Sequence, residues 1–89
     1  MLNLNKLFEI STNLEVSTEQ VGTHIELKFS NGYGASIINY GYGSNLGLWE
    51  LAVVNSKGLL DYSTPITDDV LGHLNEQEVL NTVNQIRSL

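Results

Sequence analysis

The chain has 89 residues, with ten acidic and four scattered basic side chains, a net charge of −6 and no cysteine. This length predicts one small domain, and a hydrophobic content of 42% is typical of a folded chain. The composition argues against direct nucleic-acid binding, disulfides and thiolate metal sites, and no apolar stretch is long enough to span a membrane.

The first twenty residues fit two alternatives. A helix would place Leu4, Leu7 and Phe8 on one face. A strand would instead align four apolar residues on one face, interrupted by Lys6: Leu2, Leu4, Phe8 and Ile10. The polar stretch at 13–20 predicts a turn or loop between this element and the next.

Residues 21–29 form the clearest strand pattern in the chain. Apolar side chains and Thr23 alternate there with polar residues and Gly22 over nine positions, as expected of a half-buried strand. The dipeptide Asn31-Gly32 favours a type I′ hairpin turn. It should lead into an antiparallel second strand at 33–40.

The next elements continue an antiparallel meander. Glycine-rich residues 41–47 predict a loop or bulged connection, because glycine weakens a strand interior. Residues 48–54 predict a third strand, and its two apolar faces indicate a central position. A turn at 55–58 then leads to a short fourth strand at 59–62.

The C-terminal part changes to helical signals after Ser63-Thr64-Pro65, which should end the sheet. The segment Thr67-Asp68-Asp69 predicts the cap of a short helix that ends at Gly72 or His73. Asn75 and Glu78 have the spacing of a capping box. They predict an amphipathic helix over 76–88.

Together these elements predict the α+β class: an antiparallel meander of about four strands, a short helix, and a C-terminal amphipathic helix packed on one face. We expect a single domain, 1–89, with a variable N-terminal segment at 1–20, the sheet at 21–62 and a helical C-terminus at 67–88. So small a core, with an uncovered sheet edge or face, also favours a homodimer.

The stretch 31–49 is the candidate binding region, since it holds five of the eight glycines and four of the seven aromatic residues. Two Gly-Tyr-Gly elements lie nine residues apart and should flank the second strand. Tyrosine and tryptophan offer stiff, half-polar contact surfaces, and glycine permits close approach. The predicted binding residues are Tyr33, Tyr40, Tyr42, Trp49, Gly32, Gly34, Gly41 and Gly43. An ordinary turn and bulge would explain the same residues.

Other chemistry has weaker support in the sequence. His24 is the best candidate for a general base, and a hydrolase would need it beside Ser30, Ser36 or Thr23. The glycine loop lacks the spacing of known phosphate-binding motifs, although its backbone amides could still hold a nucleotide. Helix capping explains the acidic pair Asp68-Asp69 better than a cation does. We therefore predict no catalytic, cofactor or metal residues.

Three segments in this order resemble a family of small proteins encoded by bacteriophages. They read NGYGASII at 31–38, GLWELAV at 47–53 and DYSTPITDDVLG at 61–72, and the resemblance covers residues 21–89. It implies expression in the cytoplasm of an infected bacterium and supplies no functional residues.

Three functions follow as hypotheses. The leading one is a non-enzymatic protein that binds a host protein, such as a defence protein, and modulates or inhibits it through the aromatic, glycine-rich surface. The acidic charge would steer it toward a basic partner or would only keep it soluble. The second hypothesis is a sponge for a small molecule or nucleotide signal. A structural domain without such a site is the third.

Overall fold

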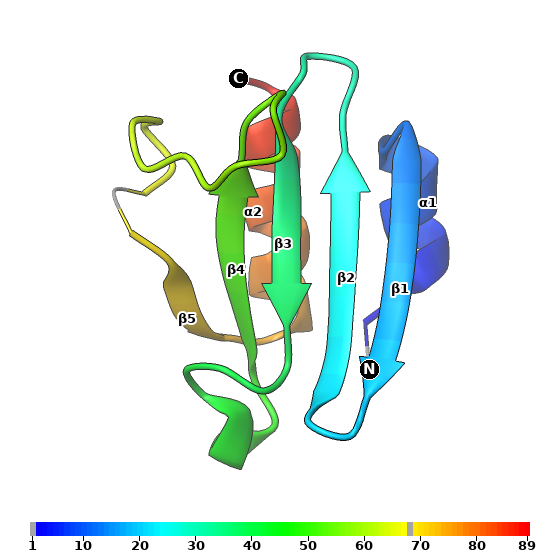
Figure 1. Ribbon diagram of the computed structural model, residues 1–89, viewed down its shortest axis with the longest axis vertical. Coiled ribbons are helices and arrows are strands. Elements are labelled where there is room, and N and C mark those ends of the chain that lie inside the picture. Colours follow the sequence, from blue (N-terminus) through cyan, green and yellow to red (C-terminus); the bar gives the residue numbers. More distant parts are fainter. Residues whose placement is uncertain (1, 68) are drawn as a thin grey trace.

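The computed structural model describes residues 2–67 and 69–89. Within these residues one antiparallel sheet has its strands in chain order, and both helices lie on the same face of the sheet (Figure 1). The elements are α1 (Leu4–Ile10), β1 (Asn13–Glu19), β2 (Gly22–Lys28), β3 (Gly34–Ile38), the 3-10 turn η1 (Ser44–Leu46), β4 (Trp49–Val54), β5 (Leu71–Leu74) and α2 (Glu76–Arg87). The predicted α+β class is confirmed, with a sheet of five strands rather than four.

The N-terminal segment contains a helix and a strand. Asn3 caps α1 by accepting a hydrogen bond from the Lys6 N–H, and Leu7 is fully buried. The helical alternative is therefore the correct one. The loop predicted at 13–20 is wrong, because Asn13–Glu19 pairs along its whole length with β2. The sequence hides this strand because it lies at the sheet edge, where most of its side chains are exposed.

The turn between β2 and β3 is a three-residue loop and not a type I′ turn. The Gly32 N–H donates to the Phe29 oxygen, and the Phe29 N–H donates to the Tyr33 oxygen. Type I′ needs positive φ at both central residues, whereas here Gly32 has φ +90° and Asn31 does not have positive φ. The loop Asn55–Leu59 repeats the same hydrogen bonds with Gly58 in the left-handed position.

The side chain of Asn31 fastens this loop to the end of α2. Its amide nitrogen lies 2.9 Å from the Ile86 oxygen, 3.1 Å from the Arg87 oxygen and 3.2 Å from the Leu89 oxygen. Its own oxygen accepts from the Tyr33 N–H at 2.9 Å. The last carbonyls of a helix lack partners within the helix, and Asn31 supplies one.

The strand predicted at 59–62 and the helix predicted to end at Gly72 or His73 are both corrected. Residues 59–62 contribute only a single bridge, between Leu60 and Val54. Leu71–Leu74 is the strand β5, which pairs with the other half of β4. β4 lies inside the sheet, so its backbone N–H and C=O groups need partners on both sides. Pairing with β4 therefore makes 71–74 a strand despite the local helix signals. Asp68 of the predicted cap lies outside the described residues.

The predicted C-terminal helix is confirmed as α2. Asn75 accepts from the Glu78 N–H at 2.9 Å, and Glu78 accepts from the Asn75 N–H at 3.0 Å, so the capping box is complete. Val79, Val83 and Ile86 are fully buried against the sheet, where they join the side chains of the inner face of β2, β3 and β4 in one core. In the described part of the chain, no helix has the length and apolar character needed to cross a membrane.

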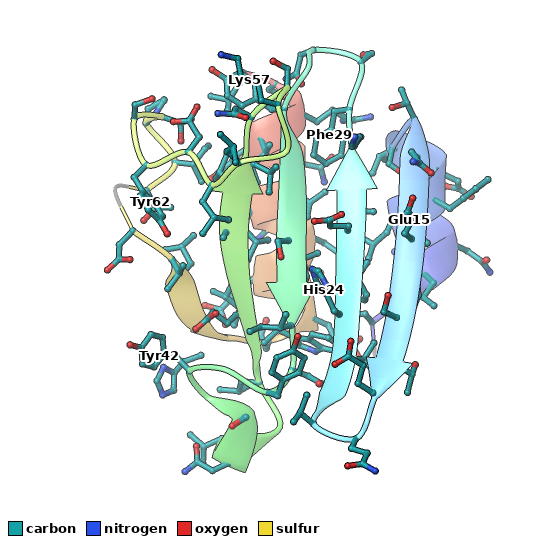
Figure 2. All side chains as sticks on the ribbon, in the orientation of Figure 1. Glu15, His24, Phe29, Tyr42, Lys57 and Tyr62 are labelled. Carbon is teal, nitrogen blue, oxygen red and sulfur yellow. The ribbon has the colours of Figure 1, made fainter. Side chains whose placement is uncertain are left out.

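The other face of the sheet carries no helix. The register places Glu15, Glu26, Ser36 and Ala52 in one row across it, and Ser17, His24, Ile38 and Glu50 in the next. Figure 2 views this open face and shows Glu15 and His24 on it. The sheet therefore has a covered apolar face and a mainly polar open face.

The Asn31 bridge generates the first prediction. Replacement of Asn31 by alanine should lower the free energy of unfolding by about 1 kcal/mol, because the helix-end carbonyls and the Tyr33 N–H lose their shared partner. Urea denaturation followed by circular dichroism measures the change. The control Asn45→Ala, at an exposed position in η1, should change stability by less than about 0.5 kcal/mol. Equal effects of the two substitutions would contradict a bridging role.

Candidate binding surface

The two Gly-Tyr-Gly elements lie at opposite ends of β3, as predicted. Gly32-Tyr33-Gly34 belongs to the β2–β3 loop and the start of β3, whereas Gly41-Tyr42-Gly43 lies between β3 and β4. The structure therefore does not unite all the predicted binding residues in one surface. It separates Tyr33 from Tyr42, and Tyr40 and Trp49 make other contacts.

The first element has a structural role. Tyr33 is half-buried and packs against the hydrophobic core. Gly34 is buried, and a Cβ at this position would collide with the backbone oxygen of Leu27. Packing therefore accounts for the presence of Tyr33 and Gly34 at these positions, and Gly32 supplies the positive φ that the turn requires.

The second element is held by its backbone against β4 and β5. The Tyr42 backbone N–H donates to the Glu50 carboxylate at 3.1 Å, and the Tyr42 carbonyl oxygen accepts from the His73 backbone N–H at 3.0 Å. Gly41 lies directly beside the same carboxylate. Both polar groups of the Tyr42 peptide backbone are thus bound to other strands of the sheet.

Two glycines permit this close approach. A Cβ on Gly72 would lie 2.5 Å from the Cβ of Tyr42, and a Cβ on Gly43 would lie 2.8 Å from the Cα of His73. Gly43 also has φ +98°, a conformation that other residues rarely adopt. His73 itself has φ +56° and lies at a bulge opposite β4. The segment 41–43 and the β5 bulge are therefore fitted to each other.

The rings of this element remain outside the core. Tyr42 is 66% exposed and Tyr40 is 38% exposed, and Leu46 of η1 is exposed on the same connection. We call Tyr42 and Leu46 the β3–β4 surface. The Tyr40 ring lies elsewhere, beside Gly22 at the start of β2, whereas Tyr42 lies beside Gly72 of β5. Figure 2 shows Tyr42 on the β5 side of the molecule, at the opposite end from Phe29 and Lys57. Sequence reasoning missed Leu46, whose only signal was an apolar side chain inside a glycine-rich loop.

Trp49 is half-buried and separates two hollows. One has a volume of about 270 Å³ and lies on the helix side of the sheet, between the N-terminal segment, the end of β1 and the start of β2. The other has a volume of about 420 Å³ and lies between η1 and the start of α2. Asn39 lines both hollows. Trp49 thus lines these hollows and is not part of the β3–β4 surface.

The glycine loop does not form a phosphate cradle in this structure. Its amides donate to protein oxygens: Ser44 to Gly41, Leu46 and Leu48 to Gly43, and Gly47 to Ser44. The Tyr42 amide is taken by Glu50. An anion-binding nest requires several amides that point together at the ligand. The geometry therefore gives no support to nucleotide binding by this loop.

His24 lies beside one of the serines considered for a hydrolase. Its Nε2 is 2.8 Å from the Ser36 Oγ on the open face of the sheet. No hydrogen bond from the other ring nitrogen is found among the described residues, so the imidazole lacks the orienting third group of a catalytic triad. None of the described hollows has either side chain in its lining.

Acidic side chains give no metal centre in the described part of the chain, where no group of three or more suitable ligands gathers. Asp61 serves a local turn. The Ser63 hydroxyl and the Ser63 N–H donate to its carboxylate, which lowers the pKa of Asp61 below its usual value. Of the Asp68-Asp69 pair, Asp68 lies outside the described residues.

The fit between Gly43 and His73 generates the second prediction. Gly43→Ala should lower the free energy of unfolding by about 1–3 kcal/mol more than Gly47→Ala does. Both glycines have positive φ, but a Cβ on Gly47 would meet nothing within 4 Å. The difference between the two variants in urea denaturation therefore isolates the contact with β5. Equal losses would show that the segment is not clamped there.

Comparisons of the chain with protein-family models, with curated proteins and with solved structures give no match.

Proposed function

We propose that this protein is a non-enzymatic binding module whose β3–β4 surface docks on another protein. The observation that carries the proposal is the contrast at Tyr42. Its backbone is fixed by Glu50 and His73, yet its ring is 66% exposed. A ring on a backbone fixed in this way contributes little to the core and is exposed for contact with a partner.

Rigidity matters for affinity because ordering a loop on binding costs free energy. A side chain whose main chain is already fixed avoids part of that cost. Tyrosine also has few rotatable bonds and combines an apolar ring with a hydroxyl group. Tyr42 is therefore suited to act as the anchor, with Leu46 of the same connection as a further exposed apolar side chain.

The charge of the chain bears on the choice of partner. With ten acidic and four basic residues, the net charge of −6 would attract a basic protein surface and slow the approach of nucleic acid. The resemblance to small bacteriophage proteins makes a host protein in the bacterial cytoplasm the expected partner. Modulation or inhibition would follow from occupying that partner's surface.

Tyr42 provides the third prediction. Tyr42→Ala should weaken partner binding by at least about 2 kcal/mol, about thirtyfold, because it removes a central aromatic anchor. Tagged wild-type protein and variants are used to capture proteins from bacterial host cells, and the captured species are quantified by mass spectrometry. Binding constants are then measured with the purified partner.

Tyr62→Ala is the matched control, because Tyr62 is also exposed but lies on the segment after β4. A specific partner should be retained by Tyr62→Ala and by wild type, and lost with Tyr42→Ala. Tyr33→Ala should mainly destabilise the fold, since that ring packs on the core. A partner retained by the Tyr42 variant would overturn the proposed surface.

The hollows beside Trp49 favour one alternative function, the binding of a small molecule such as a nucleotide signal. The larger hollow, about 420 Å³, falls within the usual range of ligand sites, and an indole wall can stack on a base.

Trp49 allows a direct test of this alternative and gives the fourth prediction. It is the single tryptophan of the chain, so its fluorescence reports on both hollows. A bound nucleotide should quench or shift this emission and raise the melting temperature as the ligand concentration increases. The probes are nucleoside mono- and triphosphates and cyclic dinucleotides. If none of them changes the emission or the melting temperature, the alternative fails for nucleotides.

A hydrolytic enzyme has less support than either protein binding or small-molecule binding. The His24–Ser36 pair is the closest approach to a nucleophile and base in the described residues, but it stands on an open sheet face without a cleft or an orienting acid. The proposal therefore assigns the molecule recognition and no covalent chemistry.

A further inference from the structure

The two edges of the sheet are built differently. β5 has four residues and contains a bulge with His73 at positive φ. Short length and bulges are common means of blocking strand addition. β1 has seven residues, contains no proline and pairs with β2 without a bulge. Only the β5 edge is blocked against further pairing.

The direction of the unpaired backbone groups follows from the register. The Asn39 N–H donates to the Thr23 carbonyl oxygen, so the backbone N–H and C=O groups of odd-numbered residues in β2 point toward β3. The backbone groups of even-numbered residues in β2 therefore point toward β1, where they pair with odd-numbered residues. The N–H and C=O groups of Leu14, Val16 and Thr18 therefore point away from the sheet, along its outer edge.

Apolar side chains border this edge. α1 lies behind the first part of β1 and extends beyond its outer side (Figure 1). Phe8 of α1 is 68% exposed and Val16 of β1 is 44% exposed. Leu4, one helical turn before Phe8, is exposed as well. The edge thus combines free backbone groups with apolar contacts, and the hollow of about 270 Å³ opens beneath the last part of the same strand.

We propose that a second copy of this chain pairs with the β1 edge, antiparallel, about a two-fold axis at Val16. Val16 then lies opposite the partner's Val16, and Leu14 lies opposite the partner's Thr18. All three are residues whose backbone groups point outward, so these pairs are the hydrogen-bonded ones. The two sheets join into one, with their helix-covered faces on the same side.

Charge selects this register. With the axis at Val16, Glu15 lies opposite Ser17 and Glu19 lies opposite Asn13, so no two acids face each other. An axis at residue 15 would place Glu15 against its own copy, and an axis at residue 17 would place Glu15 against Glu19. Like charges directly opposite each other on paired strands are destabilising. The register with the longest overlap therefore avoids the charge repulsion that its two neighbours would create.

The same axis brings α1 of one copy to the hollow of the other. It sets the start of one β1 beside the end of the other, and α1 lies behind the start whereas the hollow lies beneath the end. Phe8 then faces the hollow lined by the partner's Val16, Thr18 and Ile25. One symmetric contact thus covers both the most exposed ring of α1 and an apolar hollow, as expected of a two-fold interface.

A cysteine cross-link tests this arrangement and gives the fifth prediction. In Val16→Cys the two cysteines would lie directly opposite each other, about 5.5 Å apart between Cα atoms, within the range for a disulfide. The chain has no other cysteine. Mild oxidation should convert Val16→Cys to a covalent dimer. The control Thr18→Cys should remain uncross-linked, because its two cysteines would be about 13 Å apart along the strands.

Light scattering on the unmodified protein should give the mass of a dimer, and Phe8→Asp should shift it toward the monomer while the circular dichroism spectrum is retained. Tyr42→Ala should leave the dimer intact, which separates this proposal from the binding function. A monomer that does not cross-link would overturn the proposal and leave the edge for a peptide strand. Cross-linking by Thr18→Cys rather than Val16→Cys would overturn the register.

Discussion

The close approach of the chain at Tyr42 to Gly72 is the constraint on which the β3–β4 connection and β5 depend. A single methyl group on Gly72 would overlap the Cβ of Tyr42, and one on Gly43 would overlap His73. Because these positions are glycine, the 41–43 segment can donate to and accept from strands β4 and β5. That contact positions the β5 bulge, and it also leaves the Tyr42 ring on the outside.

This constraint explains why glycine and tyrosine occur together in the second element. From the sequence, glycine is expected to permit close approach at a binding surface. In the structure the close approach lies within the protein, where the glycines let the segment be held against β5, and the tyrosine side chain remains exposed. The first element has the same three letters but another role, because Tyr33 packs on the core. Composition alone cannot separate the two cases.

Local patterns predicted the elements that are stabilised locally. The alternation at 21–29 gives β2, and the spacing of Asn75 and Glu78 gives the capping box of α2. The errors lie where distant pairing decides. β1 has few buried side chains to mark it, and β5 overrides a helix signal because β4 offers free backbone groups. The Asn31 bridge to α2 spans more than fifty residues and has no signature in the sequence.

The two proposed surfaces complement each other because they lie at different parts of the sheet. β1 forms one edge, whereas the β3–β4 surface is fixed against β4 and β5 near the other edge. A two-fold axis at β1 would therefore carry two copies of Tyr42 on the far sides of a continuous sheet. Binding of one copy would raise the effective concentration of the other at a partner that has two matching sites, so modest affinity at each ring becomes tight attachment overall. A chain of 89 residues has little surface for a large interface, and pairing two small rigid surfaces is one physical way to gain strength without enlarging either.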